Sequence, residues 1–201
     1  MNIITNLSIP IYEFWCPDEI IVNVKSSLAS MEWTKNVNNE ISVDRNINND
    51  FLISWINSSL AEISKHVYPD VIAKLNVESL WITKTHKNSF HHTHSHPNSI
   101  CSGILYLDDS KNGGNTRFYM PDPWWKFHND GLFNFTDRAH EQKEMILGEV
   151  IPKIGKMIIF PSHIKHSVTP NLDINTRYTV AFNSFFRGII GNGFNGSAIT
   201  I

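Results

Sequence analysis

The chain has 201 residues, with 17 basic and 19 acidic side chains, so its formal net charge is −2. This near-neutral balance gives no strong field toward phosphate groups, which argues against nucleic acid as a partner. Hydrophobic residues make up 41% of the chain and aromatic residues 11%, which is enough for a substantial core and excludes a mostly disordered protein. The length predicts a single domain over residues 1–201.

Cysteine content and hydropathy narrow the class further. The two cysteines, Cys16 and Cys101, are too few for a disulfide scaffold or a cysteine-ligated zinc module. The first residues lack the basic and apolar regions of a secretion signal, and no stretch of 18 apolar residues follows. We therefore expect a cytoplasmic protein that makes no membrane contact.

The first part of the chain, residues 1–73, reads as mainly helical. Pro17, Asp18 and Glu19 are typical of a helix start, and apolar residues follow at helical spacing: Ile20, Ile21, Val24, Leu28 and Met31. The Asn-rich stretch 36–49 is predicted to be a loop. Asp50 is then expected to cap a second helix that ends near Tyr68-Pro69, with one apolar face made by Leu52, Trp55, Ile56, Leu60 and Ile63.

From Lys74 onward the hydrophobic period changes to two, which is typical of half-buried strands. A first strand begins near Lys74, and five more are predicted at Ser102–Leu107, Asn115–Tyr119, Lys156–Phe160, His166–Thr169 and Arg177–Phe186. Residues 108–114 form a turn between two of them. Helices followed by a run of strands predict an α+β fold in which residues 74–188 form a barrel or jelly roll and 189–201 a tail.

An irregular, aromatic insert interrupts the strands between Met120 and Ile151. It contains Trp124, Trp125, Phe127, Phe133 and Phe135. Long loops in compact domains are often functional, which favours a lid over a substrate. A hydrophobic plug, or a contact within a homodimer, explains the same composition equally well.

Five of the ten histidines fall within eleven positions, from His86 to His96. On an extended strand His94 and His96 project from the same face, which suits two ligands of one metal ion. A third ligand must come from elsewhere, and His166 follows a glycine turn and an apolar strand. His92 competes with His94, and His163 competes with His166, although the connector around His163 suggests an exposed side chain.

Arg177 opens a later strand, eleven residues after His166. A buried guanidinium is costly unless it meets an anion, and its planar fork matches a carboxylate. An isolated His-x-His pair is weak evidence for a metal site. The pair together with the distant His166 and with Arg177 is much stronger evidence.

The ordered motifs together resemble one family. They are His94-Ser95-His96-Pro97-Asn98-Ser99, Ser102-Gly103-Ile104-Leu105-Tyr106-Leu107, Gly113-Gly114-Asn115-Thr116-Arg117-Phe118, Phe160-Pro161-Ser162, His166 and Arg177-Tyr178-Thr179. From Trp81 to Gly188 the chain is similar to the Fe(II)- and 2-oxoglutarate-dependent oxygenases, in a branch from bacteria and their phages related to prolyl 4-hydroxylases. High Asn and Ile usage is typical of AT-rich genomes and fits a phage or marine bacterium.

The resemblance implies a double-stranded β-helix flanked by N-terminal helices. It also implies that His94, His96 and His166 are the catalytic iron ligands, and that Arg177 and Thr179 bind the far carboxylate of 2-oxoglutarate. The reaction would then consume O₂ and 2-oxoglutarate, release succinate and CO₂, and hydroxylate a prolyl, other peptidyl or small-molecule substrate. Thr83, Tyr106 and Asn183 are further candidates for co-substrate binding, and core packing or turn closure explains them as well.

One position departs from the family pattern, because His96 stands where the usual iron carboxylate would be. Asp108 and Asp109 lie too far along the chain to replace it. Three histidines also suit a zinc hydrolase or lyase, but such an enzyme has no need of a buried arginine for a dicarboxylate. A non-catalytic jelly roll with histidines on a loop is the third alternative.

Overall fold

The computed structural model describes residues 9–44, 47, 49–68, 73–120, 146–190 and 198–200. In these ranges the helical elements are α1 (Asp18–Ser27), the short 3-10 helix η1 (Leu28–Ser30) and α2 (Asp50–Val67). The strands of the first half are β1 (Tyr12–Trp15), β2 (Trp33–Asn36), β3 (Asn39–Ser42), β4 (Lys74–Thr85), β5 (His91–His94) and β6 (Cys101–Tyr106). Those of the second half are β7 (Thr116–Tyr119), β8 (Ile146–Val150), β9 (Lys156–Pro161), β10 (His166–Val168), β11 (Arg177–Arg187), β12 (Ile189–Ile190) and β13 (Ile199–Thr200).

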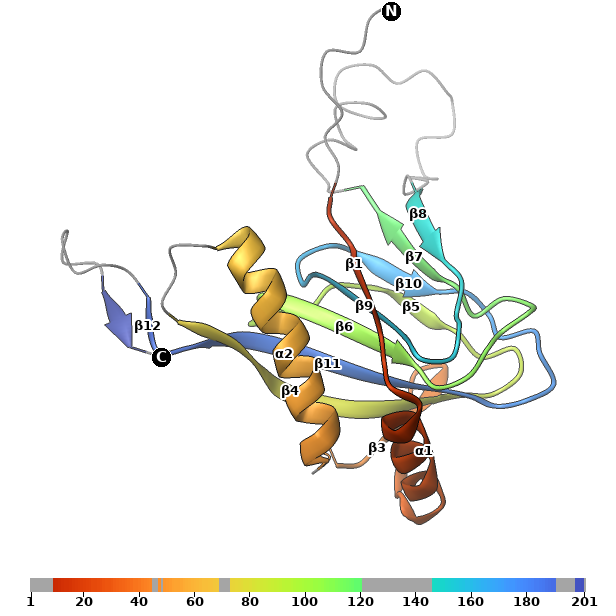
Figure 1. Cartoon of the computed structure of the whole chain (residues 1–201). Helices are drawn as coiled ribbons and strands as arrows, with labels where there is room; N and C mark the ends of the chain where they lie inside the picture. The colour runs from red at the N-terminus through yellow and green to blue at the C-terminus, as the bar shows by residue number, and fades with distance from the viewer. Residues whose placement is uncertain are drawn as a thin grey trace, which may run out of the picture.

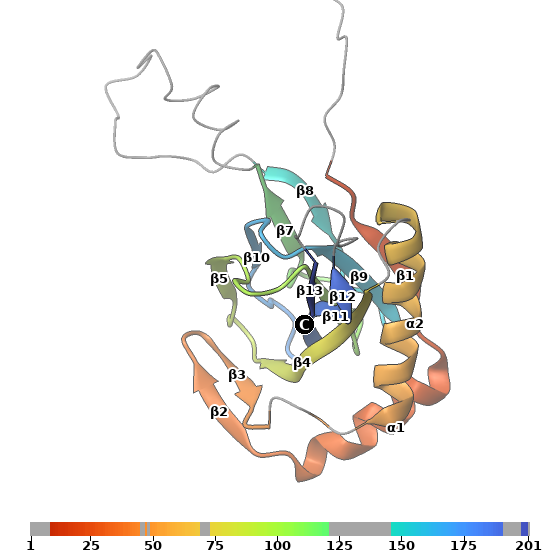
Figure 2. The same cartoon turned by 90° about the vertical axis from the view of Figure 1, so that its left-hand side faces the viewer.

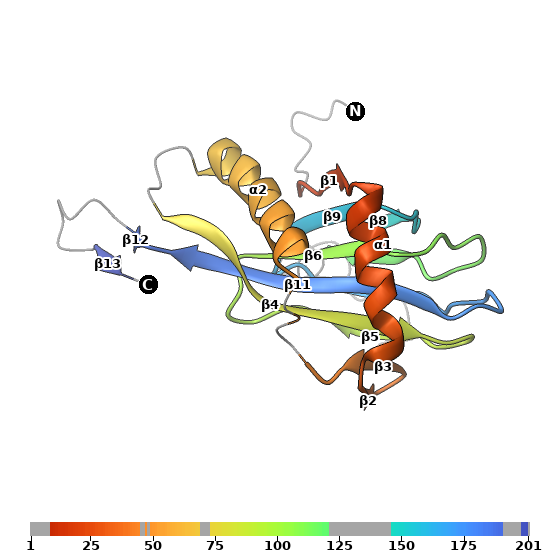
Figure 3. The ribbon, with the colours of Figure 1, turned by 60° about the horizontal axis from the view of Figure 1, so that its bottom comes forward.

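Two antiparallel sheets face each other. The larger has seven strands in the order β1-β9-β6-β11-β4-β3-β2, and the smaller has four in the order β5-β10-β7-β8. Both helices lie on the side of the large sheet that faces away from the small sheet (Figure 2). Figure 3 shows α1 and α2 crossing the strands of the large sheet side by side, while the short β12–β13 pair lies beyond the end of β11 (Figure 1).

The alternation of side chains along each strand separates two hydrophobic layers. On β9, Met157 and Ile159 pack in the cluster that includes the helices. The intervening Ile158 and Phe160 belong to a second cluster between the sheets, together with Tyr106 and Phe118. Because successive residues of a strand point to opposite faces, one sheet holds the helices on one side and a closed inter-sheet space on the other.

The second helix agrees with the sequence prediction except at its cap. Asn49, and not Asp50, is the N-cap: its side-chain oxygen accepts a hydrogen bond from the backbone N–H of Leu52 at 3.1 Å. Asp50 occupies the first helical position instead, where its negative charge still interacts favourably with the helix dipole.

The prediction of a loop over residues 36–49 is wrong in its first part. Residues 33–42 form the β2–β3 hairpin, and β3 pairs with β4 through Glu40 opposite Lys84 and Ile41 opposite Thr83. Asparagine is depleted in strands, so the local composition hid a segment whose backbone is stabilised by pairing with a distant strand. Strand β1, which pairs with β9, was also not predicted from the sequence.

The aromatic insert falls largely outside the described residues, since these resume at position 146. Trp124, Trp125, Phe127, Phe133 and Phe135 are therefore not placed. Its last part, Ile146–Val150, is strand β8, which pairs with β7 at the edge of the small sheet. Among the described residues, no helix combines the length and the apolar character needed to cross a bilayer.

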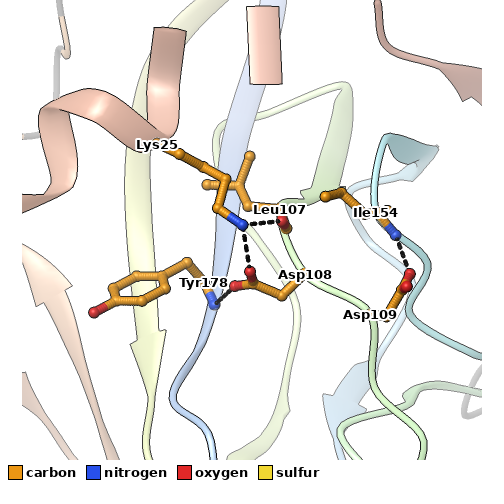
Figure 4. Close-up of polar contacts among 6 residues, drawn as sticks. All are labelled: Lys25, Leu107, Asp108, Asp109, Ile154 and Tyr178. Atoms are coloured by element: carbon orange, nitrogen blue, oxygen red, sulfur yellow. Dashed lines mark hydrogen bonds and ion pairs between the residues drawn. The ribbon is translucent and has the colours of Figure 1, made fainter. Parts of the chain in front are cut away.

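Asp108 ties the first helix to the end of the central strand, as Figure 4 shows. Its carboxylate accepts hydrogen bonds from Lys25 Nζ at 2.7 Å and from the backbone N–H of Tyr178 at 2.8 Å. The neighbouring Asp109 accepts from the backbone N–H of Ile154 at 2.8 Å. Both carboxylates are thus engaged by main-chain donors of the large-sheet region, consistent with the expectation that they do not replace His96.

We predict that Gly103→Ala destabilises the fold. A Cβ at Gly103 would lie 2.1 Å from Cζ of Phe182, a fully buried side chain on the paired strand β11. Overpacking of this kind costs about 1–3 kcal/mol, measured as a loss in the free energy of unfolding by chemical denaturation. Gly148→Ala on β8 is the matched control, because a Cβ there meets no atom within 4 Å. Equal stability of the two variants would contradict the packing described here.

Candidate active site

The three histidines of interest come together at one end of the inter-sheet space. His166 of β10 lies directly opposite His94, the last residue of β5. His96 follows two residues later and donates its backbone N–H to Ser162 O at 2.9 Å. One ring nitrogen from each histidine lies within 4.8 Å of the others. The expectation that His94 and His96 share one strand is corrected: β5 ends at His94, and the irregular backbone after it turns His96 toward the same point.

Two of these rings are oriented by the main chain. His94 Nδ1 lies 2.8 Å from the carbonyl oxygen of His92, and His166 Nδ1 lies 3.0 Å from that of Ile164. A carbonyl oxygen only accepts, so each Nδ1 carries the hydrogen and each Nε2 keeps a lone pair. Metal-binding histidines are commonly fixed in this way, because the hydrogen bond selects the tautomer and the ring orientation.

Burial keeps the three rings neutral. Loss of solvent, with a smaller contribution from the nearby His94, lowers the pKa of His166 to about 3 and that of His96 to about 4. Burial also lowers the pKa of His94. Neutral imidazole is the form that binds a metal, so at pH 7 the group is poised as a set of three nitrogen ligands.

The competing histidines are separated by their exposure. His166 is only 2% exposed, whereas His163 is exposed to solvent and belongs to neither histidine group nor the cavity lining. His92 is also exposed, although it belongs to a second group with His91 and His94. In the described part of the chain no carboxylate joins either histidine group.

The large sheet contributes hydroxyl groups to the same space. Thr179 of β11 is paired with Thr83 of β4 on one side and with Tyr106 of β6 on the other. Residues at paired positions point to the same face, so this register forms a row of three buried hydroxyls. One cavity is lined by this row, by Arg177 and by the three histidines.

Arg177 is buried in this cavity, and among the described residues no carboxylate forms a hydrogen bond or ion pair with it. It is 4% exposed, and its Nη1 donates to the carbonyl oxygen of Gly114 at 2.7 Å. Among the described residues, Arg177 Nε is the one buried side-chain polar atom without a hydrogen-bond partner. Gly114 has a φ of +69°, and a Cβ there would lie 3.2 Å from the guanidinium carbon, so this position requires glycine.

Tyr106 links the two sheets across the cavity. Its side chain is fully buried, and its hydroxyl lies 2.7 Å from Oγ1 of Thr116 on β7. Burial raises the pKa of Tyr106 to about 12, so the phenol stays protonated at neutral pH and keeps a hydrogen to donate. Tyr106 therefore fills the core and faces the cavity at once.

Asn183 is the predicted site residue that does not line this cavity. Its side-chain oxygen accepts from Ser102 Oγ at 2.8 Å, and Ser102 is in turn 2.8 Å from Ser162 Oγ. Since Ser162 O accepts from His96, this polar network supports the backbone that carries the histidine. Asn183 thus makes a supporting contact, and its role in co-substrate binding stays a prediction.

Four polar residues of the cavity lining were not singled out as site residues from the sequence: Asn39, Thr85, His91 and Thr116. Thr85 lies opposite Arg177, and the two-residue period from Thr83 predicts its orientation. His91 was visible as a member of the histidine cluster. Asn39 has no such signal, because its strand was taken for a loop.

Comparisons with known proteins agree with this arrangement. Residues 79–183, slightly more than half of the chain, match the family model of 2OG-Fe(II) oxygenases. No match was found among curated protein sequences.

Several solved structures share the fold. A prolyl-4-hydroxylase from Pseudomonas putida has a TM-score of 0.61 and 13% identity, covering 90% of this chain and 95% of its own. The α-ketoglutarate-dependent epimerase SnoN from nogalamycin biosynthesis has a TM-score of 0.63 and 12% identity, and the match covers 88% of this chain and 78% of SnoN. HygX from Streptomyces hygroscopicus, with nickel and 2-oxoglutarate bound, has a TM-score of 0.59 and 11% identity, and the match covers 88% of this chain and 82% of HygX. These likenesses confirm the predicted α+β fold with a double-stranded β-helix, or jelly roll.

We predict that the metal-free protein loses stability as the pH falls below about 6.5. The histidine pKa values are lower in the fold than the usual 6.5, so the unfolded chain takes up protons first. This stability is fully present above pH 6.5 and declines as the pH falls toward 4. Thermal unfolding in the presence of a chelator measures it. His96→Asn removes one of the shifted groups, so its melting temperature should fall less steeply, and an identical pH dependence would contradict the assignment.

Proposed function

This chain belongs to the 2OG-Fe(II) oxygenase family, and from that premise we propose that it hydroxylates a peptidyl or small-molecule substrate. An enzyme of this family uses Fe(II), 2-oxoglutarate and O₂. In the proposal His94, His96 and His166 hold the iron, and Arg177 binds the far carboxylate of 2-oxoglutarate. Thr179, Thr83 and Tyr106 complete the co-substrate pocket.

The unpaired Nε of Arg177 is the observation that carries this proposal. A guanidinium that is almost fully buried and lacks an acidic partner is destabilising unless a ligand supplies the negative charge. Burial lowers the pKa of Arg177, although the group remains a cation at any physiological pH. The cavity that contains the histidine triad thus also contains a free donor matched to a carboxylate.

The donor set fits iron as well. Imidazole nitrogen suits Fe(II), and three protein ligands on one side leave positions for the two oxygens of a 2-oxo acid and for O₂. When bound, the metal and co-substrate supply the oxidising chemistry, in which 2-oxoglutarate becomes succinate and CO₂ and one oxygen atom enters the substrate. Compared with the usual set, His96 replaces an anion by a neutral ligand, so the protein contributes no negative charge to the metal.

The residues of the chain itself orient the co-substrate and keep water out. Protonated Tyr106 is a donor within the same row as Thr179, and both hydroxyls lie beside the arginine in the sheet register. Phe160 and Trp81 also line the cavity, which makes its walls partly apolar. Hydrogen bonds and charge attraction are stronger in such a site than in water, so one arginine and a few hydroxyls suffice to fix a dicarboxylate.

Two substrate classes follow from the structural likenesses. One of the similar structures is described as a prolyl-4-hydroxylase, which favours a peptidyl substrate. Two others favour a small molecule, because SnoN is described as an enzyme of nogalamycin biosynthesis and HygX is described with hygromycin B bound. A zinc hydrolase is disfavoured, because it would leave the buried arginine without a role.

Turnover assays test the proposed reaction. We expect succinate release from 2-oxoglutarate with Fe(II) and ascorbate, stimulated by members of a peptide and metabolite library. The stimulating compound should gain one oxygen atom, detected by mass spectrometry. Conversion of a substrate without consumption of 2-oxoglutarate would contradict the proposal and favour hydrolytic chemistry.

Arg177→Ala should abolish 2-oxoglutarate binding and leave metal binding nearly unchanged. Loss of a buried charged partner costs about 2–5 kcal/mol, which corresponds to an affinity at least about 30-fold weaker. Anaerobic calorimetry on manganese-loaded protein measures it. Arg187→Ala is the matched control, since Arg187 lies on the same strand but is exposed and pairs with Glu78. Unchanged affinity in Arg177→Ala would overturn the assignment.

His96→Ala should weaken Fe(II) binding strongly, because two remaining imidazoles hold the ion poorly. His163→Ala should leave it unchanged, since that side chain is exposed and outside the triad. His96→Asp should retain iron, because it restores the common set of two histidines and one carboxylate. Metal content after anaerobic loading measures all three variants. Full occupancy in His96→Ala would remove His96 from the ligand set.

A further inference from the structure

A second histidine group lies immediately outside the triad. His91, His92 and His94 each present one ring nitrogen within 4.8 Å of the others. All three belong to β5, which is the edge strand of the small sheet, and His92 is exposed to solvent. The rings are close: the centroids of His91 and His94 are 4.3 Å apart and those of His92 and His94 are 5.5 Å apart. The proposed reaction gives no role to His91 or His92.

His91 is held in the manner of a metal ligand. Its Nδ1 lies 3.4 Å from the side-chain amide of Asn39, a buried residue of β3. The side-chain oxygen of Asn39 accepts a hydrogen bond from Asn36 Nδ2 at 3.0 Å, and the nitrogen of Asn39 faces His91. Exchange of oxygen and nitrogen in both amides keeps the bond between them with its direction reversed, lets Asn39 accept a hydrogen from His91 Nδ1, and leaves Nε2 free. The carbonyl groups of His92 and Ile164 act in the same way on His94 and His166. An ordered partner of this kind is not needed by a histidine that only decorates a surface.

The two groups share His94, and this sharing constrains both. Because Nδ1 of His94 donates to the carbonyl oxygen of His92, the ring has one lone pair for a metal. A lone pair binds one ion at a time. An ion bound by His91, His92 and His94 therefore takes His94 away from the inner triad, which keeps only His96 and His166.

We propose that His91, His92 and His94 form an outer site for a divalent cation such as Zn²⁺, and that this site and the inner triad exclude each other. Three imidazoles and one water match the four-coordinate preference of Zn²⁺. Nitrogen ligands bind Zn²⁺ more tightly than Fe²⁺, a preference that both histidine groups share, so Zn²⁺ in the outer site would compete with iron through the common ligand His94. Zinc bound outside would thus withhold His94 from iron.

Equilibrium dialysis with Zn²⁺ alone tests the outer site without any turnover. His96→Ala weakens the inner triad and leaves the outer one intact. In this background, adding His91→Asn and His92→Asn should weaken Zn²⁺ binding at least about tenfold, roughly 1.4 kcal/mol. Adding His163→Ala instead should change nothing, because His163 belongs to neither group. Equal Zn²⁺ affinity with and without His91 and His92 would overturn the proposal.

A second measurement tests whether the outer site and the inner triad exclude each other. At saturating Zn²⁺ the wild-type chain should hold one ion and not two, measured by elemental analysis after dialysis. Two bound ions would refute the sharing of His94. A circular dichroism melt of each variant establishes that it is folded. If the multiple variant does not fold, the single variant His92→Asn replaces it, because that substitution changes only an exposed side chain. His92→Asn alone should then still bind Zn²⁺ less tightly than wild type in the presence of equimolar Fe(II), and equal binding would count against the outer site.

Discussion

The burial of one guanidinium group, to which no carboxylate of the described residues is hydrogen-bonded, is the constraint on which the site depends. Strand β11 lies between β4 and β6, and its pairing with both fixes Arg177 on the inner face of the large sheet. Gly114 leaves room for the Arg177 side chain, and its carbonyl oxygen accepts a hydrogen bond from Arg177 Nη1. Asp108 fixes the backbone of the next residue, Tyr178, but does not bond the guanidinium itself. The fold thus holds a cation in place and leaves its negative partner to a ligand.

The two sheets contribute different residues to the site. The small sheet, through β5 and β10, brings the histidines together, while the large sheet supplies the arginine and the row of hydroxyls. Tyr106 and Thr116 join the sheets by a hydrogen bond at the cavity wall. A change in the spacing of the sheets would therefore alter the distance between the three histidines and Arg177. The inter-sheet packing of Phe118 and Phe160 sets that spacing.

Much of this arrangement could be predicted from the sequence, and the failures have physical reasons. The period of two along β4 and β11 predicted both strands, and the family resemblance pointed to Thr179. The candidate histidines were indicated by the spacing of His94 and His96 and by the distant His166. The β2–β3 hairpin escaped because it is stabilised by pairing with β4, which Asn-rich composition does not reveal. The pattern also does not reveal that the Asn183 side chain is hydrogen-bonded to Ser102, because the two residues are brought together only by the pairing of β11 with β6.

The central claim is that the free donor of Arg177 and the three histidines bind the two ends of one 2-oxo dicarboxylate. A crystal structure of the protein with Mn²⁺ and 2-oxoglutarate, grown anaerobically, tests this most directly. We expect the far carboxylate to accept a hydrogen bond from Arg177 Nε, and the metal to be bound by His94, His96 and His166. A co-substrate bound elsewhere, with Nε of Arg177 still unpaired, would contradict the account.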